Sequence, residues 1–237
     1  MNRRPAAQAP AFATRADRPE HRPEVNPYRD AHRLYGPGLV PAEDAPRWRG
    51  GWHENFGRSA PIHLELGLGN GRHLAARAAA QPEIDFVGLE IRYKRCVVAA
   101  ERAREAGAES RVRVVRYSWF SLDDLFAEGE LSGIHVYHPD PWERGRQAKH
   151  RLIEPGFVLA AARLVAPGGE LRLKTDFKGH FDALLAALPG TPWQVVGASL
   201  HVARDGAPWP DDIVTGYQAK FNEKALPVYA AWLRRGM

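Results

Sequence analysis

A carboxylate, an aromatic ring and several cations lie close together in the segment that begins at Tyr137. The sequence there reads Tyr-His-Pro-Asp-Pro-Trp and follows a short apolar run. A basic stretch comes next and holds Arg144, Arg146, Lys149, His150 and Arg151. Cations of this kind bind phosphates, and the ring of Trp142 can stack on a nucleic-acid base. The carboxylate of Asp140, between two prolines, is then the group that could act on a reacting atom.

A glycine-rich turn lies upstream, directly after the apolar run of residues 62–66. Gly67, Gly69 and Gly71 follow that run with the spacing G-x-G-x-G. Glycine is needed where the backbone adopts a positive φ and approaches a ligand closely. This spacing differs from the G-x-G-x-x-G of dinucleotide sites, and Glu65 precedes it. Both features favour S-adenosylmethionine over a cofactor that carries a pyrophosphate.

Further strand ends supply candidate contacts to this cofactor. Glu90 ends the apolar run of residues 86–90, and 90 − 67 = 23 positions separate it from the first glycine. A carboxylate at that place can accept both ribose hydroxyls. An adenine can lie against the backbone after the third predicted strand, and the fourth strand ends near the methyl group to be transferred. The predicted cofactor contacts are Glu65, Gly67, Gly69, Gly71, Glu90, Ser118 and Asp140.

Asp140 is also the predicted catalytic residue. Methyl transfer to a ring nitrogen with a free lone pair, such as N7 of guanine, needs no proton removed beforehand. The nucleophile instead gains positive charge in the transition state. A carboxylate about 4 Å away would stabilise that charge by at most about 4 kcal/mol at an effective dielectric constant near 20, which is about a thousandfold in rate. The sequence therefore predicts an RNA-modifying methyltransferase.

Alternating short apolar runs and amphipathic segments from Ile62 onward predict the elements that position these residues. The pattern is typical of a parallel sheet covered by helices on both faces. Strands are expected near residues 62–66, 84–90, 111–116, 133–138, 169–174 and 194–200. Helices are expected near residues 71–80, 92–106, 153–166 and 178–188. Residues 213–221 are expected to form a late strand at the sheet edge, followed by a short terminal helix.

Composition indicates one α/β domain with an appended arm. The chain has 237 residues, and its 44% hydrophobic content is enough for one sizeable core. Residues 1–45 are rich in Ala, Pro, Arg and Glu and are expected to form a flexible N-terminal arm, whereas residues 46–237 are expected to form the methyltransferase domain. A formal net charge of +5 favours a polyanionic partner.

Other features exclude several classes of protein. The lone Cys96 cannot form an internal disulfide, the apolar stretches are too short to span a membrane, and no secretory signal is evident. We therefore expect a cytoplasmic protein without a membrane partner. The scattered histidines show no metal-ligand spacing, so we expect no metal. The glycine spacing disfavours a nicotinamide dehydrogenase. The sequence leaves open whether the protein is a monomer or a homodimer.

In the order of its motifs, the chain resembles the bacterial tRNA (guanine-N7)-methyltransferase family over about residues 60–230. The family's E-x-G-x-G-x-G turn corresponds to residues 65–71, its G-[IL]-E strand end to residues 88–90 and its P-D-P-W signature to residues 139–142. Thr175 and Asp176 resemble its T-D pair, and residues 215–221 resemble its late T-x-Y-E-x-K-F motif.

This resemblance implies a class I methyltransferase fold, which is a doubly wound, mostly parallel seven-stranded sheet with its last strand antiparallel. It implies methyl transfer from S-adenosylmethionine to a guanosine in the tRNA variable loop. It also implies that Arg144 holds a phosphate and that Asp176, Thr215 and Gln218 hold the target nucleotide.

Three positions depart from the family's pattern. Arg144 stands near the place of the family's Lys, and Tyr117-Ser118 stand where an acid or Asn is common. Gln218 replaces the Glu of the late motif. A Glu carboxylate can accept both N–H donors on the Watson–Crick edge of guanine, whereas Gln brings an NH₂ group that cannot. An unpaired donor costs on the order of 1–3 kcal/mol, so we predict weaker guanosine selection than is usual in the family.

Two alternatives remain beside this interpretation. The first is a methyltransferase of the same fold that acts on another RNA, which the replacement at Gln218 makes plausible. The second is a non-catalytic RNA-binding relative that retains the cofactor fold. Product identity on mixed RNA separates the first from the leading hypothesis, and binding without a product identifies the second.

Overall fold

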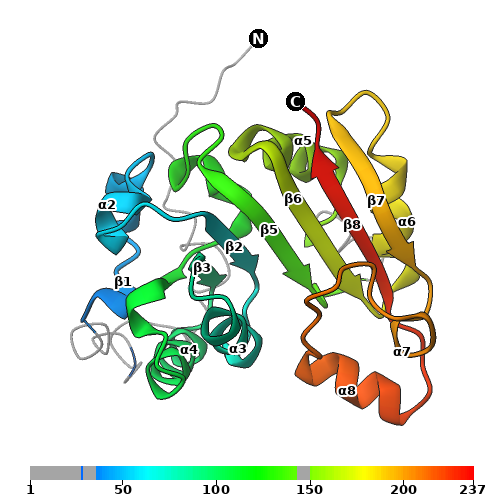
Figure 1. Ribbon diagram of the computed structural model, residues 1–237, viewed down its shortest axis with the longest axis horizontal. Coiled ribbons are helices and arrows are strands. Elements are labelled where there is room, and N and C mark those ends of the chain that lie inside the picture. Colours follow the sequence, from blue (N-terminus) through cyan, green and yellow to red (C-terminus); the bar gives the residue numbers. More distant parts are fainter. Residues whose placement is uncertain (1–27, 29–35, 143–149) are drawn as a thin grey trace.

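A computed structural model describes Tyr28, residues 36–142 and residues 150–237. In this part of the chain eight strands form one sheet, in the order β1-β4-β3-β2-β5-β6-β8-β7 (Figure 1). The strands are β1 (Leu39–Val40), β2 (Ile62–Leu66), β3 (Asp85–Glu90), β4 (Val112–Arg116), β5 (Leu131–Tyr137), β6 (Val165–Thr175), β7 (Trp193–Ser199) and β8 (Tyr229–Arg235).

Seven α-helices and four short 3-10 helices lie within the same described ranges. The α-helices are α2 (Trp52–Phe56), α3 (Arg72–Ala80), α4 (Tyr93–Glu105), α5 (Pro155–Leu164), α6 (Lys178–Ala186), α7 (Val202–Asp205) and α8 (Gly216–Glu223). The 3-10 helices are η4 (Gly36–Gly38), η5 (Ala45–Trp48), η6 (Glu109–Arg111) and η7 (Trp119–Asp124). None of these helices is long and apolar enough to cross a membrane.

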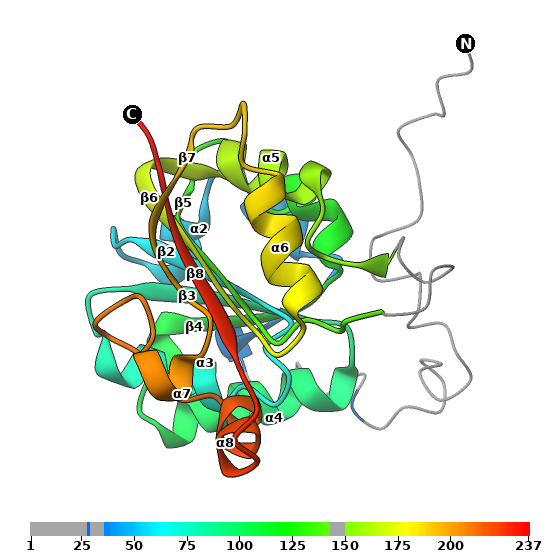
Figure 2. The same cartoon turned by 90° about the vertical axis from the view of Figure 1, so that its right-hand side faces the viewer.

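Helices cover both faces of the sheet, as the alternation of apolar runs predicts. On one face, Trp52 of α2, Phe157 of α5 and Phe181 of α6 belong to one buried apolar cluster with the central strands. Figure 2 shows α6 lying along this face of the sheet. On the other face, α3 and α4 pack against β3 and β4 through a second cluster that includes Leu74 and Ala99. Strands β1 to β6 pair in parallel, and β8 runs antiparallel to both of its neighbours. The expected doubly wound, mostly parallel sheet is confirmed.

The late part of the chain differs from the sequence-based expectation. Residues 213–221 do not form a strand: Thr215 caps α8, because its Oγ accepts a hydrogen bond from the backbone N–H of Gln218 at 3.0 Å. The expected terminal helix is instead strand β8, which is inserted between β6 and β7. Burial of Ala230, Ala231 and Leu233 stabilises that strand between its two neighbours.

The sheet has one more strand than the expected seven. Leu39 and Val40 pair in parallel with Val114 and Val115 at the edge of β4, and both side chains are buried. Residues 36–45, which the composition assigns to the arm, therefore include the edge strand of the folded body. Residues 1–27 and 29–35 of the expected arm lie outside the described residues.

Candidate active site

The predicted site residues follow the carboxyl ends of neighbouring parallel strands, which meet at one edge of the sheet. Ligands of open α/β sheets bind in the crevice at this edge. In chain order the residues are Gly67, Gly69 and Gly71 after β2, Glu90 at the end of β3, Ser118 after β4, Asp140 after β5 and Asp176 after β6. Helix α8, which begins after Thr215, lies beyond the ends of β5 and β6 (Figure 1).

The three glycines of the turn after β2 have two different roles. All three have positive φ values, of 70° at Gly67, 59° at Gly69 and 72° at Gly71. A Cβ atom at Gly67 would meet nothing within 4 Å, and at Gly69 its nearest neighbour would be 4.0 Å away. At Gly71 it would lie 2.3 Å from the Cβ of Ala99. Gly67 and Gly69 therefore leave space for a ligand, whereas Gly71 allows α3 to pack on α4.

Glu65 is buried at the end of β2 and is joined to the first turn of α3. Its Oε2 atom lies 2.9 Å from Nδ1 of His73. The imidazole of His73 in turn packs edge-on against the ring of Tyr137, with 4.5 Å between centroids. This contact spans the glycine turn, so Glu65 orders the turn that the sequence assigns to the cofactor. The partner His73 was not foreseen from the sequence.

Glu90 has a carboxylate that the backbone holds in place. Its Oε1 atom accepts hydrogen bonds from the backbone N–H groups of Ile91 at 2.8 Å and Arg92 at 3.1 Å. Its Oε2 atom lies 3.4 Å from a guanidinium nitrogen of Arg95. An acid fixed at this strand end, beside two glycines with open space, fits the ribose of S-adenosylmethionine. Ser118 is buried, and its Oγ accepts from the backbone N–H of Phe120 at 3.4 Å, which leaves a backbone contact as its expected role.

Asp140 is exposed on a turn that is anchored from two sides. The backbone N–H of His138 donates to the carbonyl oxygen of Lys174 on β6 at 2.8 Å. The guanidinium of Arg151 donates to the carbonyl oxygens of Pro141 at 3.3 Å and Trp142 at 3.2 Å. Arg151, predicted from the sequence as a phosphate contact, thus holds the turn that carries Asp140. Arg144 and its neighbours Arg146 and Lys149 lie outside the described residues.

Asp176 is paired with a histidine from the turn before Asp140. Its Oδ1 atom lies 3.0 Å from Nδ1 of His138. Burial alone would raise the pKa of Asp176, but the contact with His138 and a hydrogen bond to backbone bring the pKa below its usual value. The structure therefore brings Asp176 together with the segment that holds Asp140, although 38 residues separate the paired side chains in the sequence.

Gln218 points toward the sheet and is almost fully buried. Its Oε1 atom accepts a hydrogen bond from Nζ of Lys174 at 2.6 Å. Lys174 also forms an ion pair with Asp212 at 2.5 Å, and its side chain is fully buried. Burial lowers the pKa of Lys174, and Asp212 opposes that shift. The side-chain oxygen of Gln218 is thus used to fix α8 on β6.

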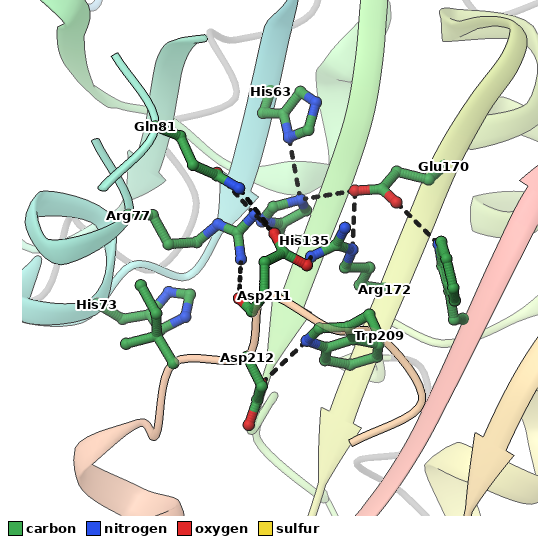
Figure 3. Close-up of polar contacts among 12 residues, drawn as sticks. His63, His73, Arg77, Gln81, His135, Glu170, Arg172, Trp209, Asp211 and Asp212 are labelled. Carbon is green, nitrogen blue, oxygen red and sulfur yellow. Dashed lines mark hydrogen bonds and ion pairs between the residues drawn. The ribbon is translucent and has the colours of Figure 1, made fainter. Parts of the chain in front are cut away.

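A buried polar cluster on the sheet was not foreseen from the sequence (Figure 3). His63 of β2 and His135 of β5 are brought together by strand pairing, and their Nδ1 and Nε2 atoms are 3.2 Å apart. Oε1 of Glu170 lies 3.6 Å from Nε2 of His135. The three groups have the proximity of metal ligands, but Nε of Arg172 is 2.8 Å from the same Glu170 oxygen. The guanidinium beside the carboxylate favours a network of ion pairs and a His63–His135 hydrogen bond over a cation site.

The same network fixes the loop that leads into α8. Asp211 accepts hydrogen bonds from Arg77 at 3.0 Å, Gln81 at 2.7 Å and Arg172 at 2.7 Å (Figure 3). Burial would raise the pKa of Asp211, but the two guanidinium groups bring it to about 2. One carboxylate therefore joins α3, β6 and the loop before Thr215, and the loop is held against the sheet.

Acid is expected to destabilise the protein through three buried histidines, His63, His135 and His180. Burial, with help from nearby arginines, lowers the pKa of His63 to about 3 and that of His180 to about 4, and it places the pKa of His135 well below 6.5. In the unfolded chain each titrates near pH 6.5. Below that pH the unfolded chain binds protons that the folded chain does not. The free energy of unfolding therefore falls as pH drops, by up to about 1.4 kcal/mol per pH unit for each histidine.

Chemical denaturation between pH 7.5 and pH 4.5 measures this slope. His180→Phe serves as the test variant, because both ring nitrogens of His180 are buried without a hydrogen-bond partner among the described residues. In the variant, the dependence of the free energy of unfolding on pH should be smaller by the contribution of one histidine, which is up to about 1.4 kcal/mol per pH unit. A free energy of unfolding that stays constant between pH 6.5 and pH 5 would contradict the assignment of these histidines as unprotonated.

Comparison with known proteins places the chain in a family. The family model described as "Putative methyltransferase" matches residues 59–231. A tRNA (guanine-N(7)-)-methyltransferase of Lactococcus lactis subsp. cremoris is 30% identical over 190 residues, which are 80% of this chain and 87% of that protein. A protein of Listeria monocytogenes with the same name is 34% identical over 182 residues, which are 77% of this chain and 84% of that protein.

Solved structures show the same fold at low sequence identity. A 16S rRNA methyltransferase, KamB, superposes with a TM-score of 0.59 at 13% identity over 79% of this chain and 94% of that one. TrmN from Thermus thermophilus superposes with a TM-score of 0.53 at 19% identity over 80% of this chain and 48% of that one. The sheet order, the inserted antiparallel strand and the glycine turn with its two acids define a class I methyltransferase. The chain belongs to the family of the bacterial tRNA (guanine-N7)-methyltransferases.

Proposed function

We propose that this protein transfers a methyl group from S-adenosylmethionine to N7 of a guanosine in the variable loop of tRNA. The observation that carries the proposal is the exposed Asp140 carboxylate, on an anchored turn at the sheet edge where the glycine turn also ends. The names and the 30% and 34% identities of the relatives support the same reaction. S-adenosylmethionine, when bound, supplies an electrophilic methyl group.

On the cofactor side, Glu90 would accept the ribose hydroxyls, and the backbone at Gly67 and Gly69 would approach the ligand. Glu65 would order this turn through His73. Gly71 contributes through the packing of α3, and the backbone after β4 at Ser118 would face the adenine. These assignments agree with the open space at the first two glycines and with the fixed carboxylate of Glu90.

On the substrate side, Asp140 would orient the guanine and stabilise the positive charge that develops on its ring. N7 carries its own lone pair, so no side chain has to remove a proton. Asp176, Thr215 and Gln218 would hold the nucleotide, and Arg144 would hold a phosphate. We also propose that the strand at Leu39–Val40 belongs with residues 46–237 to the catalytic domain, and that the enzyme works in the cytoplasm without a metal.

A methyl-transfer assay tests this function. Labelled S-adenosylmethionine is supplied with tRNA that lacks the modification, and the product nucleosides are identified by mass spectrometry. 7-Methylguanosine in the variable loop supports the proposal. Methylation of another nucleoside, or cofactor binding without any product, would contradict it and point to the alternative of another RNA or of a non-catalytic relative.

Gln218→Glu is expected to raise kcat/KM for guanosine-containing tRNA by about tenfold, on the order of the 1–3 kcal/mol that an unpaired donor costs. One carboxylate oxygen would keep the contact with Lys174, and the second would replace the amide NH₂ with an acceptor for guanine N–H groups. The measurement compares kcat/KM and base preference on tRNA variants that differ at the target position. An unchanged kcat/KM in a variant with wild-type thermal stability would show that Gln218 does not contact the base.

A further inference from the structure

His138 stands at the junction between the turn that carries Asp140 and helix α8. It is a non-glycine residue with a positive φ of 49°, a conformation that costs free energy and persists where surrounding contacts demand it. Its side chain is only 3% exposed, and Nδ1 lies 3.0 Å from Oδ1 of Asp176. Because the carboxylate of Asp176 can only accept, Nδ1 carries the proton and donates it.

The ring of His138 is also packed against α8. It stacks on Tyr217 with 5.6 Å between centroids and 26° between planes, and on Phe221 with 6.2 Å and 12°. Both aromatic residues lie on the helix that begins after Thr215. A single imidazole therefore contacts the carboxylate after β6 and the helix whose first turn holds Thr215 and Gln218.

We propose that His138 is a positioning residue for the target nucleotide. Its Nδ1–H fixes the rotamer of Asp176, and its ring fixes α8 relative to the turn of Asp140. This inference rests on the proposed function, because it assigns to Asp176 a contact with the nucleotide. The electrostatics of Asp176 agree with that role. The contact with His138 and a hydrogen bond to backbone bring the pKa of Asp176 below its usual value, so the carboxylate is ionised and can accept a hydrogen bond.

Two substitutions separate the hydrogen bond from the stacking. His138→Phe keeps a flat ring against Tyr217 and Phe221 and removes the donor to Asp176. His138→Asn removes the ring and keeps a side-chain N–H close to the position of Nδ1, and Asn also tolerates a positive φ. We expect His138→Phe to raise KM for tRNA about tenfold, with kcat and the Kd for S-adenosylmethionine within about threefold of wild type. His138→Asn should recover most of that loss.

Asp176→Ala completes a double-mutant cycle. If His138 acts through Asp176, the double variant His138→Phe/Asp176→Ala should have the same KM as Asp176→Ala within about twofold, because each change removes the same hydrogen bond. Additive increases in KM, or a wild-type KM in His138→Phe, would overturn the inference. Equal losses in the Phe and Asn variants would also overturn it, because they would indicate a purely structural contribution.

A spectroscopic measurement keeps the test independent of turnover. Nitrogen-15 NMR of the imidazole, assigned by the signals that vanish in His138→Phe, should show a proton on Nδ1 in wild type and a changed spectrum in Asp176→Ala. A wild-type ring that carries its proton on Nε2 and none on Nδ1 would overturn the pairing. A wild-type enzyme with the expected spectrum but no 7-methylguanosine product would instead refute the proposed function. The role of His138 in positioning the nucleotide would then be overturned as well, although the hydrogen bond between His138 and Asp176 would stand.

Discussion

Replacing Asp140 with Asn is expected to lower kcat for tRNA methylation by about a hundredfold. The amide keeps the size and an acceptor oxygen but removes the charge that opposes the positive charge on the guanine ring. The ceiling is about a thousandfold, for a full charge about 4 Å away at an effective dielectric constant near 20. Asp140 is exposed, so solvent screening keeps the effect below that ceiling. Single-turnover rates measure the chemical step.

Asp182→Asn is the matched control for that substitution. Asp182 is an exposed carboxylate on α6 that pairs with Lys178, and an exposed pair of this kind contributes little. The control should retain kcat within about twofold, and both variants should bind S-adenosylmethionine with a Kd within about threefold of wild type. A kcat in Asp140→Asn that stays within threefold of the control would remove Asp140 from the catalytic role.

Local sequence signals predict the central strands because each is a short apolar run with clear limits. β2 lies at residues 62–66 as expected, where Pro61 precedes it and Gly67 follows it. The C-terminal region was predicted wrongly because two local signals compete there. The apolar pair Ile213 and Val214 favours a strand, but the side chain of Thr215 caps a helix directly after it. Strand β8 pairs with both β6 and β7. This pairing depends on the arrangement of the whole sheet, which a local sequence signal does not contain.

Residues that meet only through strand order could not be found from the sequence. His63 and His135 are 72 positions apart, and they touch because β2 and β5 are neighbours in the sheet. Arg77 and Asp211 are 134 positions apart. The site residues, in contrast, follow strand ends, so their clustering at one edge could be predicted from the order of the strands alone. What each side chain contacts there, as Gln218 contacts Lys174, depends on packing.

In the glycine turn, too, the sequence does not show what each residue contacts. Gly67 and Gly71 have nearly equal φ values, of 70° and 72°, and both belong to the one spacing that predicts a cofactor turn. Sequence spacing cannot show which Cβ position faces open space and which faces another helix. Helix α4 packs on α3 with Ala99 directly at Gly71. Two substitutions of the same kind, a few residues apart, should therefore have different effects.

Gly71→Ala is expected to lower the Tm by about 5–20 °C. An alanine with left-handed backbone costs about 1–2 kcal/mol, and overpacking adds about 1–3 kcal/mol, because the new Cβ would lie 2.3 Å from Cβ and 2.5 Å from Cα of Ala99. Each kcal/mol corresponds to about 2–4 °C in a protein of this size. Thermal unfolding followed by circular dichroism measures the loss, with guanidinium denaturation as a second readout.

Gly67→Ala is the control that isolates the backbone contribution. It should lose less stability than Gly71→Ala but more affinity for the cofactor. Its φ is equally positive but its Cβ meets nothing within 4 Å in the protein, so only the left-handed cost of about 1–2 kcal/mol remains. The same Cβ would enter the space assigned to S-adenosylmethionine, and we expect the Kd for the cofactor to rise at least tenfold at a temperature where the variant is folded. Gly71→Ala, assayed at low temperature, should bind the cofactor more nearly as wild type does. Equal Tm losses in the two variants would show that α3 and α4 yield to the added methyl group, and an unchanged Kd in Gly67→Ala would place the cofactor elsewhere.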